Sequence, residues 1–177
     1  MGNYVYVATS IDGYIAKKDG SVDWLADYPN PDASDFGFAE FMAGMDVVVM
    51  GRNTFEKVLT FGQWPYEKPV CVLSRTLRGV PDQLVGKAEI VEGAPVSIVE
   101  RLNARGHQNI YVDGGRVIQS FLSHDLIDEM VITRVPMVLG NGVPLFGTTD
   151  SSLKFTLTGS EVLIGQLVMS KYSRVRR

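Results

Sequence analysis

The stretch from Asn109 to Leu122, NIYVDGGRVIQSFL, constrains the fold more than any other part of this 177-residue chain. Its apolar, β-forming opening predicts a buried strand that breaks at Asp113. Apolar residues then return at helical spacing, so a strand passes into a helix through Gly114 and Gly115. Glycines at this point would let a phosphate approach the free N–H groups of a helix N-terminus, although Gly-Gly also makes ordinary turns. Both interpretations remain open for this stretch alone.

The rest of the chain continues this alternation. Apolar runs rich in β-formers predict strands at residues 3–9, 47–50, 69–74, 89–92 and 126–135. Helical spacing with start and stop signals predicts helices at residues 34–44, 54–59 and 96–105. The alternating tail predicts a hairpin of residues 154–158 and 162–172 that turns near Gly159 and Ser160. We therefore expect a single α/β domain over residues 1–177, with a mostly parallel central sheet, helices on both faces and an antiparallel C-terminal edge hairpin.

Composition and charge exclude several classes of function. Hydrophobic residues make up 45% of the chain and charged residues 21%, which is typical of a soluble globular protein. A net charge of −3 provides no basic field for nucleic acid or an anionic membrane. No apolar run approaches the ~20 residues of a membrane span. Cys71 is the single cysteine, which forbids an internal disulfide and fits a reducing compartment. We expect a cytoplasmic protein that binds neither nucleic acid nor membrane.

The sequence also lacks the signals of metal and nucleophilic catalysis. One cysteine with only His107 and His124 cannot assemble a zinc or iron site from Cys and His. No Walker A sequence or nucleophile elbow is present. The segment 140–142, Gly-Asn-Gly, leads into Pro144 and not into a helix, which predicts a turn and no Rossmann fingerprint.

Three predicted strands end with the same combination of residues. Each end supplies backbone N–H groups or hydroxyls beside an arginine, whose fork matches phosphate bidentately. Any one of these arginines alone is best explained as a solvated surface charge. Three at one edge of a sheet indicate a ligand with several phosphates, such as a dinucleotide. The residues are Gly51-Arg52-Asn53-Thr54, Ser74-Arg75-Thr76 and Asp113-Gly114-Gly115-Arg116.

Four stretches spread over nearly the whole chain follow a known pattern. They are ATSIDGYIA at residues 8–16, VMGRNTFE at 49–56, VDGGRV at 112–117 and RVPMVLGNGVPLF at 134–146. Their order and spacing resemble the dihydrofolate reductase superfamily, and within it stand-alone reductases similar to the C-terminal reductase domain of the bifunctional riboflavin-biosynthesis deaminase-reductase. The last stretch points to the riboflavin-type branch. The zinc signature of the deaminase domain is absent, so no deaminase role is expected.

The resemblance implies an NADPH site. Backbone groups of Ala8 and Ile15 would hold the nicotinamide carboxamide, and residues 51–54 would bind phosphate at a helix N-terminus. The ribose and its 2′-phosphate would face residues 74–76, while residues 114–117 would cover the pyrophosphate. The implied cofactor residues are Ala8, Ile15, Gly51, Arg52, Asn53, Thr54, Ser74, Arg75, Thr76, Gly114, Gly115, Arg116 and Val117. The superfamily also implies a cis peptide between the two glycines.

The resemblance further implies four catalytic or substrate-binding residues. Asp35 would bond a pterin or pyrimidine ring and help to deliver a proton, with the alternative that it only caps the following helix. Thr133 matches a strand threonine near the substrate ring, and Trp24 a tryptophan near the proton-delivery water. Asp113 resembles the acidic residue that precedes Gly-Gly in the riboflavin branch, which favours a ribosylaminouracil-like substrate over folate.

Several functions remain open on the sequence. The first is an NADPH-dependent reductase similar to 5-amino-6-(5-phosphoribosylamino)uracil reductase. The others are a dihydrofolate reductase and a nucleotide-binding module that holds NADPH without turnover. A use for Trp24, Asp35 and Thr133 exists only if the protein is an enzyme. The resemblance also implies a homodimer, which the apolar tail strand at residues 162–169 supports modestly.

Overall fold

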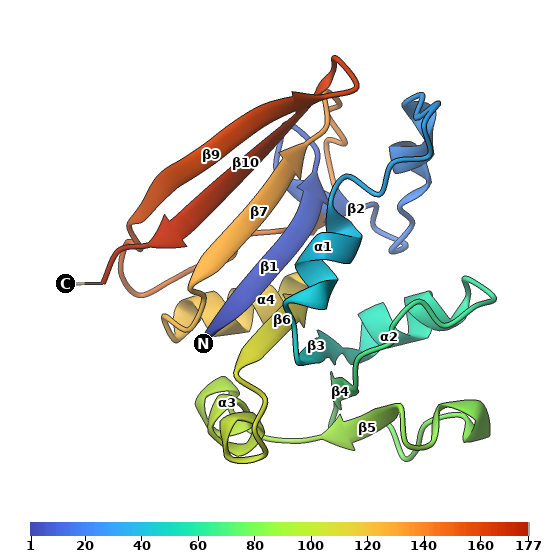
Figure 1. The fold of residues 1–177 in the computed structure, drawn as a ribbon, viewed down its shortest axis with the longest axis vertical. Coiled ribbons are helices and arrows are strands. Elements are labelled where there is room, and N and C mark those ends of the chain that lie inside the picture. Colours follow the sequence, from blue (N-terminus) through green and yellow to red (C-terminus); the bar gives the residue numbers. More distant parts are fainter. Residues whose placement is uncertain (177) are drawn as a thin grey trace.

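A single eight-stranded sheet, with strand order β5-β4-β3-β6-β1-β7-β10-β9, organises the computed structural model, which describes residues 1–176 (Figure 1). The first six strands in this order run parallel, and β10 is antiparallel to both β7 and β9. The expected α/β fold with an antiparallel C-terminal edge is confirmed. The strands are β1 Gly2–Thr9, β3 Val47–Gly51, β4 Val70–Leu73, β5 Ala88–Val91, β6 Asn109–Asp113, β7 Glu129–Arg134, β9 Phe155–Leu163 and β10 Leu167–Arg174.

Helices cover both faces of this sheet, as expected. Ile98 and Phe121, from the third and fourth helices, pack into the core on one face, and Phe41 and Phe55, from the first two, pack on the other. The helices are α1 Phe38–Ala43, α2 Arg52–Leu59, α3 Pro95–Ala104 and α4 Gly115–Ser123. Short 3-10 turns lie at Asp23–Asp27 and Asp82–Leu84.

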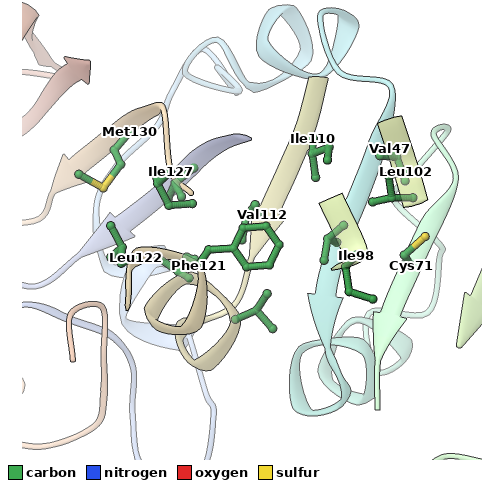
Figure 2. Packing of buried hydrophobic residues seen from close by; sticks show 14 of the residues in the cluster. Val47, Cys71, Ile98, Leu102, Ile110, Val112, Phe121, Leu122, Ile127 and Met130 are labelled. Carbon is green, nitrogen blue, oxygen red and sulfur yellow. The ribbon is translucent and has the colours of Figure 1, made fainter. Parts of the chain in front are cut away.

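Strand β3 shows why continuous apolar runs become central strands here. Val47 and Val49 enter the core beneath α3 and α4, while Val48 and Met50 enter the core on the opposite face. Side chains alternate along a strand, so a strand covered on both faces needs apolar residues at every position. Figure 2 shows the first of these cores, where Ile98 of α3 and other helix side chains meet the central strands.

The structure corrects the expected C-terminal hairpin. Strand β9 runs through Gly159 and Ser160, and the chain turns after Leu163, where Ile164 and Gly165 have positive φ values of 44° and 71°. Gly159 pairs with Lys171 beside a register shift in β10. A glycine inside a strand commonly marks such a bulge, and sequence alone does not distinguish it from a turn.

Two other expectations differ from the structure at their boundaries. The helix expected from residue 34 begins at Phe38, because Phe36 and Gly37 have positive φ values of 56° and 89° that a helix cannot contain. The loop expected over residues 10–24 contains a short strand, β2 Tyr14–Ala16, which pairs with β8 Val143–Pro144 in a separate two-stranded sheet.

Candidate functional site

The three strand ends with the repeated arginine motif lie side by side. Strands β4, β3 and β6 are parallel neighbours, so their carboxyl ends meet at one edge of the sheet, where ligands bind in open α/β sheets. A side-chain contact joins two of the ends, because Arg52 Nη1 donates to Thr76 Oγ1 over 3.0 Å. Arg52 also forms an ion pair of 2.7 Å with Glu56 one turn along α2. A polar contact therefore links the ends of β3 and β4 directly.

The remaining groups of this edge differ in how many partners they already have. The hydroxyl of Ser74 accepts hydrogen bonds from the N–H groups of Thr76 and Leu77, so it holds the turn after β4. Arg75 and Arg116 are exposed, and neither makes an ion pair or side-chain hydrogen bond within residues 1–176. Two unpaired guanidinium groups beside two helix N-termini favour an anionic ligand.

The N-termini of α2 and α4 approach each other closely because glycines remove the intervening Cβ atoms. A Cβ on Gly114 would lie 2.1 Å from Thr54 Oγ1, and one on Gly51 would lie 3.1 Å from Val117 Cγ2. Gly114 has φ +87°, a conformation that favours glycine. The expected cis peptide between Gly114 and Gly115 is wrong, since residues 1–176 contain no cis peptide.

Gly115 is covered by the small β2–β8 sheet. A Cβ on Gly115 would lie 2.9 Å from Val143 Cγ1, 3.0 Å from the Pro144 carbonyl oxygen and 3.2 Å from Ile15 Cδ1. Gln119 of α4 also donates to the Pro144 carbonyl oxygen over 2.7 Å. The structure thus brings Ile15 and Gly115 together, although 100 residues separate them in the sequence.

Asp12 holds the loops of this region together, a role that the sequence analysis missed. Its carboxylate accepts hydrogen bonds from the Ser10 hydroxyl at 2.6 Å and from the N–H groups of Leu139 and Gly140 at 3.1 and 2.7 Å. The Ser10 hydrogen bond, aided by the two backbone N–H groups, lowers the pKa of Asp12. Its place within the motif of residues 8–16 was a signal, but Leu139 and Gly140 lie more than 120 residues away.

Replacing Asp12 with alanine is expected to free the loop of residues 137–142 from the loop after β1. Amide hydrogen exchange at Leu139 and Gly140 should then accelerate, while exchange in β1 stays unchanged. Because the pKa of Asp12 is lowered, its hydrogen bonds to Leu139 and Gly140 contribute their full stability above the ordinary aspartate pKa of about 3.9. That contribution is lost as the pH falls through the lowered pKa. Asp19→Ala is the control, since within residues 1–176 Asp19 forms a hydrogen bond only with Ser21 of its own turn. Equal exchange rates in the two variants would contradict the conclusion that Asp12 holds the two loops together.

Three of the expected substrate residues share one face of the sheet. Asp113 follows Tyr111 by two residues on β6, and Tyr111 packs on the α1–α2 face. Ala8 of β1 pairs with Thr133 of β7 and packs against Trp24 on that same face. Because β6, β1 and β7 are neighbours, Asp113, Ala8 and Thr133 lie on adjacent strands near their carboxyl ends.

Trp24 is 2% exposed and packs against Val135 and Leu167. Its indole Nε1 has no hydrogen-bond partner within residues 1–176. A buried indole N–H normally has a partner, so this donor is available to a water or a ligand.

Asp113 has the chemistry of a proton donor. Tyr66 donates to Asp113 Oδ2 over 3.1 Å, and the Tyr66 ring contacts Trp64 with ring centroids 5.4 Å apart. Burial raises the pKa of the Asp113 carboxyl, although hydrogen bonds from Tyr66 and the Gly114 N–H act in the opposite direction. A carboxyl with a raised pKa at a ligand-binding edge is a candidate for acid catalysis. Tyr66 was missed because only the fold brings it to Asp113, 47 residues away in the sequence.

The contacts of Asp35 are those expected of a residue that caps the following helix. It is exposed, and its two carboxylate oxygens accept hydrogen bonds from the N–H groups of Gly37 and Ala39 at 3.0 and 2.7 Å, next to the start of α1. These bonds, that of Ala39 first, lower the pKa of Asp35. A lowered pKa makes a carboxyl less able to hold a proton for transfer near neutral pH.

No set of three or more His, Cys, Asp or Glu side chains in residues 1–176 is arranged to hold a metal ion. None of the helices there combines the length and the apolar character needed to cross a membrane.

The strand order, the helices on both faces and the polar carboxyl edge define a dihydrofolate reductase-like domain. Residues 4–169 match the family described as RibD C-terminal domain, and this chain belongs to that family. It is 38% identical to YwjB of Bacillus subtilis over 175 residues, covering 96% of each chain. It is 25% identical to YyaP of the same organism, covering 94% of this chain and 91% of YyaP.

Solved structures support the same fold. A protein of Shewanella sp. PV-4 named for riboflavin biosynthesis superimposes with a TM-score of 0.96 at 52% identity, covering 99% of this chain and all of the other. The deaminase/5-amino-6-(5-phosphoribosylamino)uracil reductase of Thermotoga maritima superimposes with a TM-score of 0.74 at 16% identity. The match covers 98% of this chain but 56% of the Thermotoga chain, so this chain resembles one part of a longer enzyme.

Proposed function

We propose that this protein is an NADPH-dependent reductase of a pyrimidine or pterin ring, and that its substrate is similar to 5-amino-6-(5-phosphoribosylamino)uracil. The observation that carries the proposal is the carboxyl edge of β4, β3 and β6, where two helix N-termini converge. Arg75 and Arg116 lie at this edge and have no ion pair or side-chain hydrogen bond within residues 1–176. Family membership and the name of the Shewanella relative support a riboflavin-related role.

In this proposal each strand end contacts a different part of NADPH. Residues 51–54 bind a phosphate at the N-terminus of α2, residues 114–117 cover the pyrophosphate, and residues 74–76 face the 2′-phosphate. Backbone groups of Ala8 and Ile15 orient the nicotinamide, whose chemistry when bound is hydride donation. Asp113 then holds a proton for the substrate ring on the face that it shares with Ala8 and Thr133.

The test follows the absorbance of NADPH with two substrates in separate reactions. Oxidation with the ribosylaminouracil phosphate and not with dihydrofolate is the expected result. Oxidation with dihydrofolate alone would make the protein a dihydrofolate reductase. Binding of NADPH without oxidation in either reaction would indicate a nucleotide-binding module.

NADPH is expected to bind more tightly than NADH. A charge-assisted hydrogen bond to the 2′-phosphate contributes about 1.5–3 kcal/mol, or roughly 10- to 150-fold in affinity. Arg75 is the better placed donor, because Arg52 already contacts Glu56 and Thr76. Titration by fluorescence quenching should show that Arg75→Ala removes most of the preference.

The matched control is Arg78→Ala, which removes another exposed arginine of the same loop. It should leave the NADPH preference unchanged. Equal affinities of the parent protein for NADPH and NADH would refute a 2′-phosphate site.

A further inference from the structure

Tyr66 reaches Asp113 from the segment between α2 and β4, and its hydroxyl donates to Asp113 Oδ2 over 3.1 Å. Aromatic contacts hold this segment against α2. The Tyr66 ring meets the Trp64 ring edge-on, with centroids 5.4 Å apart, and Trp64 meets Phe55 of α2 in the same way at 5.9 Å. Phe55 is buried in the core. These contacts therefore fix the Tyr66 hydroxyl relative to the core of the protein.

A second tyrosine lies near the same carboxyl, but its proton is engaged elsewhere. Tyr111 acts on the pKa of Asp113 in the same direction as Tyr66, and both lower it. The Tyr111 hydroxyl, however, donates to the Tyr6 carbonyl oxygen over 3.1 Å, and a hydroxyl has one proton to donate. No cation of residues 1–176 acts on this carboxyl. Tyr66 is therefore the side chain that donates a hydrogen bond to Asp113 within the described part of the chain.

Burial and the Tyr66 hydrogen bond act on the Asp113 proton in opposite directions. Burial raises the pKa of Asp113, which keeps the acid protonated but also makes it slower to release its proton. A hydroxyl that donates to Oδ2 stabilises the carboxylate that forms on release. It also occupies Oδ2, so the acid proton is carried by the other carboxyl oxygen, Oδ1.

We propose that Tyr66 is a positioning residue of the reductase, which keeps the acid proton of Asp113 on Oδ1 and stabilises the carboxylate left after proton transfer. The substrate ring gains the proton from Oδ1, and a proton from water then restores the acid. Tyr66 keeps its own proton throughout and acts only through Asp113. This inference rests on the proposed function, because it requires Asp113 to be the acid of the reaction.

Tyr66→Phe tests the proposal, because it removes the hydroxyl and keeps the ring beside Trp64. The pKa of Asp113 is followed by NMR titration of protein labelled with ¹³C at its aspartate carboxyl groups, and Asp113→Asn identifies the signal. Loss of a hydrogen bond to a charged group should raise this pKa by about one to two pH units. The fall of turnover at alkaline pH should move upward by the same amount. The plateau of kcat should fall while KM stays nearly unchanged.

Tyr4→Phe is the matched control. Tyr4 packs against the same core as Tyr66, but its hydroxyl lies at the amino end of β1, where a Cβ on Gly2 would be 3.1 Å from it. Asp113 lies at the carboxyl edge of the sheet. The control variant should therefore leave both the pKa of Asp113 and the pH profile of turnover unchanged. Circular dichroism of the two variants should match the parent.

Three results would overturn the proposal. The first is an unchanged pKa of Asp113 in Tyr66→Phe, and the second is an equal rise of that pKa in Tyr4→Phe. The third is a raised pKa with no movement of the alkaline fall in turnover. The NMR titration needs no turnover, so it separates this proposal from the proposed function. A raised pKa in a protein that reduces neither substrate would support the hold of Tyr66 on Asp113 and reject the reductase function.

Discussion

Gly115→Val is expected to abolish most NADPH binding and to destabilise the fold. Any Cβ at this position would lie 2.9 Å from Val143 Cγ1 and 3.0 Å from the Pro144 carbonyl oxygen. The second of these is backbone, which cannot rotate away as a side chain can, so β8 must shift. Overpacking of this kind typically costs about 1–3 kcal/mol. The shift would also displace Ile15 and the N-terminus of α4, so NADPH affinity should fall at least about tenfold.

Circular dichroism melting and NADPH titration together measure the two effects. The control is Gly79→Val, because Gly79 has open space around its would-be Cβ and no positive φ. It should leave both quantities unchanged. Should Gly115→Val prove too unstable to titrate, Gly115→Ala keeps the close contacts with a smaller side chain. A folded Gly115 variant that binds NADPH as well as the parent would remove this turn from the cofactor site.

Asp113→Asn is expected to lower turnover by roughly 100-fold or more, the usual contribution of a positioned acid. Asparagine keeps the shape of the side chain but has no acidic proton to transfer. NADPH affinity should change little, because the cofactor contacts proposed for this strand end come from residues 114–117. In the parent, turnover should fall as pH rises through the raised pKa of Asp113, and this step should be absent from the profile of the variant.

The stability of the Asp113→Asn variant should increase, although its turnover falls. Burial raises the pKa of Asp113, so the folded state holds its proton at pH values where the unfolded chain has lost it. The parent therefore loses stability as pH rises from the ordinary aspartate pKa through the raised one. Asparagine has no charge to bury, and its melting temperature relative to the parent should increase across that window. A merely structural role for Asp113 would not combine lower turnover with equal or greater stability.

Asp35→Asn is the comparison that decides between the two acidic residues. Its exposed carboxylate is already bound to the Gly37 and Ala39 N–H groups, so we expect a small loss of helix capping and little change in turnover. A large loss of turnover in Asp35→Asn with none in Asp113→Asn would reverse the roles and make Asp35 the proton donor.

The position of most strands was predictable because their signal is local. Uninterrupted apolar runs such as residues 47–50 and 110–112 are needed wherever helices cover both faces of a sheet, and the structure buries them. The ambiguous signals were glycines. Gly159 lies within β9, where the sequence suggested a turn, because a bulge and a turn call for the same residue. The start of α1 was misplaced because the positive φ of Phe36 has no local sequence signature.

The polar strand ends were also predictable, since each motif follows its strand directly in the sequence. Their common edge follows from a mostly parallel sheet, which the alternation of strands and helices implied. The structure then showed that β4, β3 and β6 are neighbours in that sheet. The sequence could not show which of their polar groups were already engaged. Arg52 is bonded to Thr76 and Glu56, whereas Arg75 is left without such a partner in residues 1–176.

The sequence by itself therefore determined the layer architecture and the edge at which the candidate site lies, because both follow from short-range periodicity. Tertiary structure alone decided the contacts that give individual residues their chemistry. Asp12 meets Gly140 across 128 residues, and Tyr66 meets Asp113 across 47. A carboxylate has its pKa set by burial and by the donors that surround it, so the raised pKa of Asp113 and the lowered pKa of Asp35 exist only once the chain has folded.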